Sequence, residues 1–362
     1  MFKKNNEIKY RIKLYICTRM NRSDIKEIKE LLSTPKNVVI VPHKNPDGDA
    51  IGACLAMYHY LDKKGHNATV VSPNDYPNFL KWLPGSKNAL KFDMQNRQSK
   101  KAIGEASIIF LLDFNALNRV GDDMENTLKE FKGVFMMIDH HQQPEDIAKY
   151  LFSDTSVCST CQMFYHFLEK LNDVEAINED IATCIYTGIM TDTGSFRFPS
   201  TTSTTHRIIA DLIDKGADNA KIYNHVYDTN SYARLQLLGR ALTNMVVIDK
   251  LKTAYITLSQ EELDEFDYQK GDTEGVVNYA LSLENIIFAA IFIEDIEQKI
   301  IKISFRSKGS FSVNKFAREH FDGGGHDNAA GGKSKIALDA TVSKFLKLLP
   351  VYQNELLTSY EV

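Results

Sequence analysis

Imidazole and carboxylate side chains gather in four short segments of this 362-residue chain. The first segment, residues 42–49 (PHKNPDGD), holds one histidine and two aspartates. The other three segments are centred on Asp113, on Asp139-His140-His141 and on Asp192. Histidine nitrogens and carboxylate oxygens bind divalent metal ions, and such ions activate water for hydrolysis. The four segments together therefore predict a metal-dependent active site.

Each segment also has an ordinary structural explanation. Asp47 and Asp49 are residues that often cap helices, and the proline and glycine beside them favour a turn. Asp113 or Asp192, taken singly, can be a solvated loop carboxylate. Their joint occurrence favours metal binding, because a buried strand rarely ends in several ionisable groups unless these are paired or bind a metal.

The elements that would position these residues follow from the alternation of short apolar runs and helical patterns after residue 37. This alternation predicts an α/β fold whose N-terminal domain has a mostly parallel sheet with helices on both faces. We expect strands at 38–41, 69–71, 108–112 and 134–138, and helices at 49–61, 160–171 and 180–190. Three of these strands end at the candidate residues. Ligands of open α/β sheets bind at the carboxyl ends of the strands, so this edge should bring the candidates together.

The chain is long enough for two domains. We expect an N-terminal extension at 1–22, a metal-binding catalytic domain at 23–205, a helical linker at 206–246, a smaller α/β domain at 247–352 and a tail at 353–362. In the smaller domain, strands are predicted at 253–258, 286–293 and 300–305, and helices at 313–320 and 340–349. Met20 precedes a helix that Ser23 can cap, so it is an alternative start to Met1.

Composition excludes several classes of protein. The formal net charge of −4 gives no global basic field for holding long nucleic acid. The longest apolar run, Ile286–Ile293, is too short to cross a membrane. Five scattered cysteines are typical of a reducing compartment, so we expect a cytoplasmic protein. Cys158 and Cys161 are interpreted as two thiols one helical turn apart, and not as a redox or zinc site.

The order and spacing of the segments resemble the DHH phosphoesterase superfamily with its DHH-associated C-terminal domain. The resemblance covers residues 37–332 and includes a late glycine-rich segment, Gly323–Gly331. Within the superfamily, the chain length and the combination of Arg306-Ser307 with Gly-Gly-Gly-His are most similar to one group, the nanoRNases. These are bifunctional oligoribonucleases and 3′-phosphoadenosine 5′-phosphate phosphatases. The resemblance implies two divalent ions. Mn²⁺ suits mixed imidazole and carboxylate ligands better than Mg²⁺ does.

The resemblance also implies a role for each site residue. One ion would be held by His43, Asp47 and Asp113, and the other by Asp49, Asp113, His140 and Asp192. Asp139 and His141 are the expected catalytic residues: Asp139 would orient a ligand histidine, and His141 would face the substrate. The expected substrate-binding residues are Arg306 and Ser307 for a terminal phosphate, Gly324 and Gly325 as a turn offering N–H groups to an anion, and His326 for a base.

The expected function is Mn²⁺-dependent degradation of RNAs of a few nucleotides to mononucleotides. Removal of the 3′-phosphate of 3′-phosphoadenosine 5′-phosphate (PAP) is a second expected activity. A phosphodiesterase for linear or cyclic dinucleotides, such as pGpG or cyclic di-AMP, would use the same metal centre and remains an alternative. A pyrophosphatase is less favoured because of the Gly-Gly-Gly-His segment. A non-enzymatic nucleotide-binding module is disfavoured because all six ligands are present. The expected partners are short RNAs or nucleotide 3′-phosphates and no membrane, and the sequence leaves a homodimer open.

Overall fold

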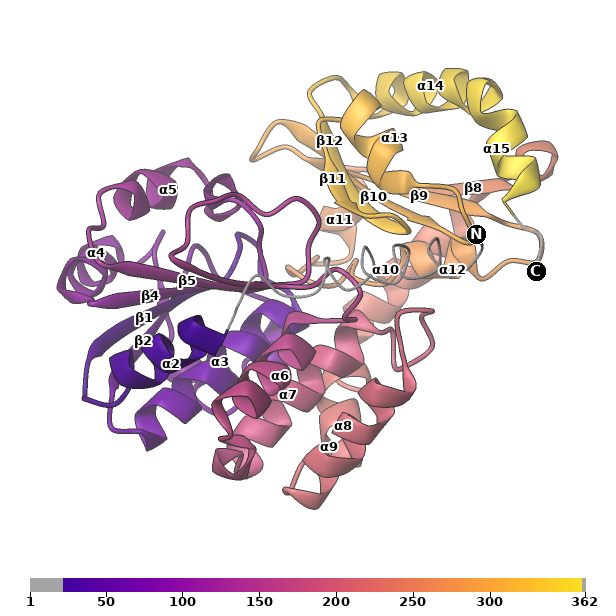
Figure 1. The fold of residues 1–362 in the computed structure, drawn as a ribbon. Coiled ribbons are helices and arrows are strands. Elements are labelled where there is room, and N and C mark those ends of the chain that lie inside the picture. The colour runs from indigo at the N-terminus through magenta and orange to yellow at the C-terminus, as the bar shows by residue number, and fades with distance from the viewer. Residues whose placement is uncertain (1–21, 360–362) are drawn as a thin grey trace, which may run out of the picture. The chain divides into compact units, whose positions relative to one another are not determined.

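The computed structural model describes residues 22–359, which form two compact units that meet in the chain after Thr229 (Figure 1). The predicted extension at 1–22, including Met20, therefore lies outside the described residues except for Arg22. No helix within 22–359 is long and apolar enough to cross a membrane.

The first unit is built on a six-stranded sheet in the order β3-β2-β1-β4-β5-β6. Every neighbouring pair in it is parallel. Its strands are β1 (Asn37–Val41), β2 (Asn67–Ser72), β3 (Leu90–Lys91), β4 (Ile108–Leu112), β5 (Val134–Asp139) and β6 (Tyr150–Ser153). The strand order reverses direction between β1 and β4. Such a reversal opens a crevice at the carboxyl ends of the two strands, where ligands bind in this class of fold.

Helices cover both faces of this sheet, as predicted (Figure 1). Successive strand residues point to opposite faces, so Val38 and Ile40 join one core while Val39 and Val41 join the other. The helices before and between the strands are α2 (Arg22–Leu31), α3 (Gly48–Lys63), α4 (Asn96–Glu105) and α5 (Asp122–Lys129). Those after the sheet are α6 (Thr160–Leu171), α7 (Glu179–Asp192), α8 (Ser203–Asp214) and α9 (Asn219–Tyr227). Burial on both faces explains why these strands are almost wholly apolar.

Helices α3 and α7 pack closely through glycines. A Cβ atom on Gly52 of α3 would lie 2.6 Å from the carbonyl oxygen of Cys184 on α7. A Cβ atom on Gly188 of α7 would collide with the sulfur of Cys161 and would lie 2.8 Å from Oδ1 of Asp49. Only glycine fits at these two contacts, and the close approach sets the position of Asp49.

The second unit is a smaller α/β unit with a mixed sheet in the order β11-β12-β10-β9-β8-β7. Its strands are β7 (Val246–Ile248), β8 (Thr253–Leu258), β9 (Phe288–Asp295), β10 (Ile300–Ser307), β11 (Gly324–His326) and β12 (Ala329–Ser334). The accompanying helices are α10 (Tyr232–Thr243), α11 (Gln260–Glu265), α12 (Val277–Leu281), α13 (Val313–His320), α14 (Leu338–Leu348) and α15 (Gln353–Thr358). Apolar cores lie on both faces of this sheet too.

Two segments differ from their sequence-based description. The stretch 206–246, expected to be a linker, is divided between the units. Ile208 and Ile222 are buried in the first unit, whereas Leu237 is buried in the second. The expected tail begins with helix α15, whose Leu356 is buried in the core of the second unit. In both segments the apolar side chains are buried in a core, because burial stabilises them more than exposure to solvent does.

Candidate metal centre

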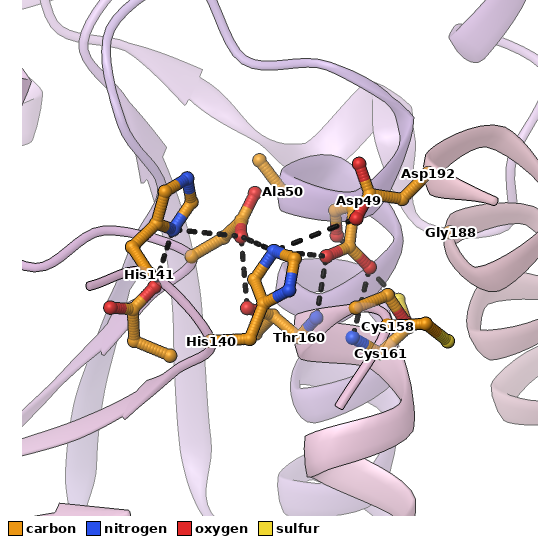
Figure 2. Close-up of polar contacts among 12 residues, drawn as sticks. Asp49, Ala50, His140, His141, Cys158, Thr160, Cys161, Gly188 and Asp192 are labelled. Carbon is orange, nitrogen blue, oxygen red and sulfur yellow. Dashed lines mark hydrogen bonds and ion pairs between the residues drawn. The ribbon is translucent and has the colours of Figure 1, made fainter. Parts of the chain in front are cut away.

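The candidate residues of the first unit meet at the carboxyl edge of its sheet. Figure 2 labels Asp49, His140, His141 and Asp192 among them. His43 follows β1, Asp113 follows β4, and Asp139 ends β5. Among the described residues, three groups of possible ligands include Asp113. The first adds His43 and Asp47, the second adds Asp49 and His140, and the third adds Asp139 and His141. Within each group the ligand atoms all lie within 4.8 Å of one another. The shared carboxylate makes Asp113 the centre of the cluster.

The first group combines a helix cap with a possible ligand. Oδ1 of Asp47 accepts hydrogen bonds from the backbone N–H groups of Asp49 and Ala50, each at 3.1 Å, and so caps α3. Oδ2 of Asp47 lies 3.9 Å from Nε2 of His43, which in turn lies 3.5 Å from Oδ2 of Asp113. The capping explanation and the ligand explanation are therefore compatible, because they use different oxygens.

The second group is arranged around the imidazole of His140 (Figure 2). Its Nε2 lies 3.5 Å from Oδ1 of Asp113, 3.5 Å from Oδ2 of Asp192 and 3.9 Å from Oδ2 of Asp49. Its Nδ1 donates a hydrogen bond to the carbonyl oxygen of Val157 at 3.2 Å. This bond fixes the ring so that Nε2 faces the carboxylates.

Helix α6 presents its N-terminus to the cluster, which sequence reasoning did not foresee. The backbone N–H groups of Thr160 and Cys161 donate to the two oxygens of Asp49 at 2.5 and 2.9 Å. The hydroxyl of Thr160, which is fully buried, donates to Oδ1 of Asp113 at 2.9 Å. Thr160 thus holds two carboxylates at once. The only signal in the sequence is Ser159, an N-cap residue placed just before an apolar helical pattern.

The backbone at Asp113 is left-handed, with φ of +66°. Residues other than glycine rarely adopt this conformation, and asparagine and aspartate tolerate it best. The amide of Asp113 donates to the carbonyl oxygen of Ile138 on β5 at 3.1 Å, which holds the turn in place. The conformation lets the side chain leave the end of β4 and lie between His43 and His140. Backbone strain of this kind is concentrated at functional sites.

Charge in the cluster explains why it suits cations. Burial raises the pKa of Asp49 well above its usual value, and the carboxylates of Asp113 and Asp192 add to the effect. Burial also raises the pKa of Asp192, to about 7. Burial by itself would lower the pKa of His140, but its hydrogen bond with Asp113 and the charge of Asp192 raise it well above the usual range. Buried carboxylates that repel one another, with imidazole nitrogens beside them, fit divalent metal ions.

Asp139 and His141 form a hydrogen-bonded pair beside Asp113. Nδ1 of His141 donates to Oδ1 of Asp139 at 2.7 Å, and Nδ1 also lies 3.7 Å from Oδ1 of Asp113. Asp139 is fully buried. We expected Asp139 to orient a ligand histidine, but the histidine that it contacts is His141, whereas His140 is held by a backbone carbonyl. The difference arises because successive residues after β5 point in different directions.

In the second unit, Arg306 and Ser307 stand at the end of β10. The guanidinium of Arg306 is half-buried and donates to the carbonyl oxygen of Phe305 at 2.9 Å. The hydroxyl of Ser307 is buried, donates to the carbonyl oxygen of Phe311 at 2.6 Å and accepts from Nδ2 of Asn328 at 2.9 Å. Ser307 is thus engaged within the fold, and Arg306, its neighbour on β10, is half-buried.

Gly324 and Gly325, expected in a turn, lie in strand β11. Gly324 pairs with Gly331 and His326 pairs with Ala329 on β12. The N–H group of Gly325 donates to Oδ1 of Asn314 on α13 at 3.1 Å. Asn314 also accepts from Nε of Arg318 at 3.1 Å. Sequence reasoning missed these two residues, although their spacing of four on a predicted helix places them on one face.

The cysteines within the described residues are free and buried. Burial raises the pKa of the Cys158 thiol to about 12, which disfavours the thiolate that redox or zinc chemistry needs. Cys158 donates to Oε1 of Gln162 at 3.0 Å. Both observations agree with the interpretation of Cys158 and Cys161 as packing residues.

Comparisons with known proteins agree with this geometry. The N-terminal domain of the DHH family matches residues 37–189, and the DHHA1 domain matches residues 249–349. The bifunctional oligoribonuclease and PAP phosphatase NrnA of Thermus thermophilus is 31% identical over 317 residues, 86% of this chain and 88% of that protein. The cyclic-di-AMP phosphodiesterase GdpP of Bacillus subtilis is 25% identical over 340 residues, 90% of this chain and 49% of that protein.

Among solved structures, an exopolyphosphatase-related protein from Bacteroides fragilis has the same fold. It superimposes with a TM-score of 0.88 at 41% sequence identity, and the match covers 93% of this chain and 98% of that one. The match spans both units of the chain.

Proposed function

This chain belongs to the DHH family of phosphoesterases and carries a DHHA1 domain, and we propose from this premise that it degrades very short RNAs to mononucleotides and dephosphorylates PAP to AMP. The family places it among hydrolases that act on phosphodiester bonds. The finer assignment rests on its similarity to NrnA along most of both chains. We propose the cytoplasm as its compartment, on the cysteine content alone.

The observation that carries the proposal is that the first and second ligand groups share Asp113. We propose that His43, Asp47 and Asp113 hold one ion, and that Asp49, Asp113, His140 and Asp192 hold the other. Two divalent ions, which we propose to be Mn²⁺, would supply an activated water and stabilise negative charge on the phosphate. The chain's own contribution is to hold four carboxylates and two imidazoles close together before the substrate arrives.

His141 is the proposed proton-transfer residue. Its Nδ1 donates to Asp139 at 2.7 Å, which orients the ring, and we propose that Nε2 exchanges a proton with the substrate. In the second unit, we propose that Arg306 binds a substrate phosphate through its planar fork of donors. Gly324, Gly325 and His326 are the proposed neighbours of that phosphate and its base, and Ser307 supports the strand end by its bonds to Phe311 and Asn328.

A phosphodiesterase for linear or cyclic dinucleotides is the second candidate. The similarity to GdpP along 90% of this chain supports it. The metal centre would serve either reaction, so substrates must separate the candidates. We expect Mn²⁺-stimulated turnover of di- and trinucleotides and of PAP to exceed that of longer RNAs and of cyclic di-AMP when all are measured side by side. Faster turnover of cyclic di-AMP than of any linear RNA would favour the second candidate, and binding of all these compounds without turnover would favour a non-enzymatic module.

A further inference from the structure

Two cationic side chains flank the metal centre in the first unit. Lys44 directly follows His43, and Arg119 lies in the short 3-10 helix η3 (Leu117–Val120) after β4. The backbone N–H group of Lys44 donates to the carbonyl oxygen of Arg119 at 2.8 Å. This bond ties together the loops that follow β1 and β4, the two strands between which the sheet order reverses. The two residues therefore stand at the position where this class of fold binds its ligands.

Neither cation pairs with an acidic side chain in the part of the chain that the structure describes. Within residues 22–359, no carboxylate oxygen lies within ion-pair distance of Lys44 or Arg119, although four aspartates form the cluster next to them. Lys44 is exposed and Arg119 is half-buried. Arg119 follows Asp113 in the loop after β4, so it lies at the same edge of the sheet as the cluster.

The loops that carry the two cations are cross-linked by hydrogen bonds. Asn45 and Asn74 bond to each other reciprocally and join the loop after β1 to the loop after β2. Nδ2 of Asn115 donates to the carbonyl oxygen of Gln142 at 2.7 Å, which joins the loops after β4 and β5. These hydrogen bonds therefore hold the loops that carry Lys44 and Arg119 in place before any ligand binds.

Gly121 makes room for the lysine side chain. Its φ of +83° is a left-handed conformation that favours glycine. A Cβ atom on Gly121 would lie 3.0 Å from Cδ and 3.4 Å from Nζ of Lys44. The side chain of Lys44 thus lies against a glycine at the end of the short helix that carries Arg119.

We propose that Lys44 and Arg119 form a subsite for a phosphate group of the substrate other than the one that is hydrolysed. This inference rests on the proposed function. Four carboxylates and two divalent ions already make a nearly neutral centre, so the centre needs no further positive charge. A guanidinium and an ammonium on two hydrogen-bonded loops, without carboxylate partners among residues 22–359, suit a phosphate, since arginine binds it through two parallel N–H bonds and lysine as a point charge. PAP and 5′-phosphorylated dinucleotides both carry such a second phosphate.

The test compares substrates that have one or two phosphates. Lys44→Gln, Arg119→Gln and Arg119→Lys are assayed as metal-loaded enzymes on PAP, on a 5′-phosphorylated dinucleotide and on bis-p-nitrophenyl phosphate, which has a single phosphate. Arg97→Gln, at an exposed position on α4, is the matched control. Titration calorimetry measures the affinity for Mn²⁺, and thermal denaturation monitors folding.

We expect each glutamine variant to lose about 10- to 100-fold in kcat/KM on the two-phosphate substrates. The loss on the single-phosphate diester should be at least several-fold smaller, and Mn²⁺ affinity and melting temperature should match those of Arg97→Gln. Arg119→Lys should recover part of the loss. Equal losses on all three substrates, or a changed Mn²⁺ affinity, would show that the cations serve the metal centre and would overturn the subsite. A wild-type enzyme that turns over neither two-phosphate substrate would instead overturn the proposed function.

Discussion

At the scale of single residues, Asp113 connects the ligand groups of His43 and His140. Its oxygens lie 3.5 Å from Nε2 of His43 on one side and 3.5 Å from Nε2 of His140 on the other. Its left-handed backbone also constrains what can replace it. Alanine would strain the turn as well as remove the carboxylate, whereas asparagine keeps the shape and tolerates the conformation. Asparagine therefore separates the chemical role from the structural one.

Asp113→Asn and Asp139→Asn should differ in their effect on activity. Asp113 is proposed to contact both ions, so its replacement should abolish turnover with little change in melting temperature. Asp139 acts through His141, and a change outside the direct ligands typically costs about 10- to 100-fold. Steady-state assays on a trinucleotide, with calorimetric Mn²⁺ titration, measure both effects. Equal losses at the two positions would count against the assignment of Asp113 to the metals.

Thr160 provides a second test at this scale. Thr160→Val keeps the size and the backbone N–H bond to Asp49 but removes the hydroxyl that donates to Asp113. The hydroxyl holds Asp113 in position, and a hydrogen bond to a charged group contributes about 1.5–3 kcal/mol, so we expect weaker Mn²⁺ binding by roughly tenfold or more when Asp113 loses it. Thr160→Ser keeps the hydroxyl and should restore most of the affinity. A serine variant as weak as the valine variant would show that the methyl group, and not the hydroxyl, matters.

The sequence predicted which residue types gather, but not all of their contacts. His43, Asp47, Asp49, Asp113, His140 and Asp192 could be selected because each follows a recognisable strand or begins or ends a helical pattern. The role of Thr160 could not be predicted, since it depends on the placement of α6 against β4 and α3 in three dimensions. The pairing of Asp139 with His141 likewise depends on backbone direction after β5, which residue types do not encode.

At the scale of elements, the long buried strands were predictable and the short ones were not. The strands β1, β4 and β5 are continuous apolar runs, the expected pattern for strands buried on both faces. Strand β3 has two residues, and β11 consists of two glycines and a histidine, so neither carries a periodic signal. The glycines of β11 form a strand because β12 offers a pairing edge, which is a tertiary effect.

The contact between α3 and α7 gives a prediction for an element. Gly188→Ala places a methyl group against the sulfur of Cys161 and Oδ1 of Asp49. Overpacking of this kind costs about 1–3 kcal/mol, so both the free energy of unfolding and Mn²⁺ affinity should fall. Gly104→Ala on α4 is the control, because a Cβ atom there meets nothing within 4 Å. Chemical denaturation measures both variants. If Gly188→Ala behaved like Gly104→Ala, the close packing would not position Asp49.

At the scale of the whole molecule, length alone predicted two domains, and the structure has two units with separate cores. The place of the boundary was harder to predict. The helical stretch 206–246 has apolar faces throughout, and the sequence does not reveal which core each face joins. Ile222 packs in the first unit and Leu237 in the second, so the boundary falls within the stretch that looked like a linker.

The role of the second unit is tested through Arg306. We expect Arg306→Ala to weaken turnover of di- and trinucleotides, because a short RNA has few phosphates and one charge-assisted contact contributes about 1.5–3 kcal/mol of its binding energy. Hydrolysis of bis-p-nitrophenyl phosphate should fall far less, because this diester lacks a further phosphate. Arg306→Lys should recover part of the loss, since it restores the charge but not the fork. Lys347→Ala, at an exposed position on α14, is the control. If Arg306→Ala slowed both substrates equally, the residue would support the fold and the second unit would need another role.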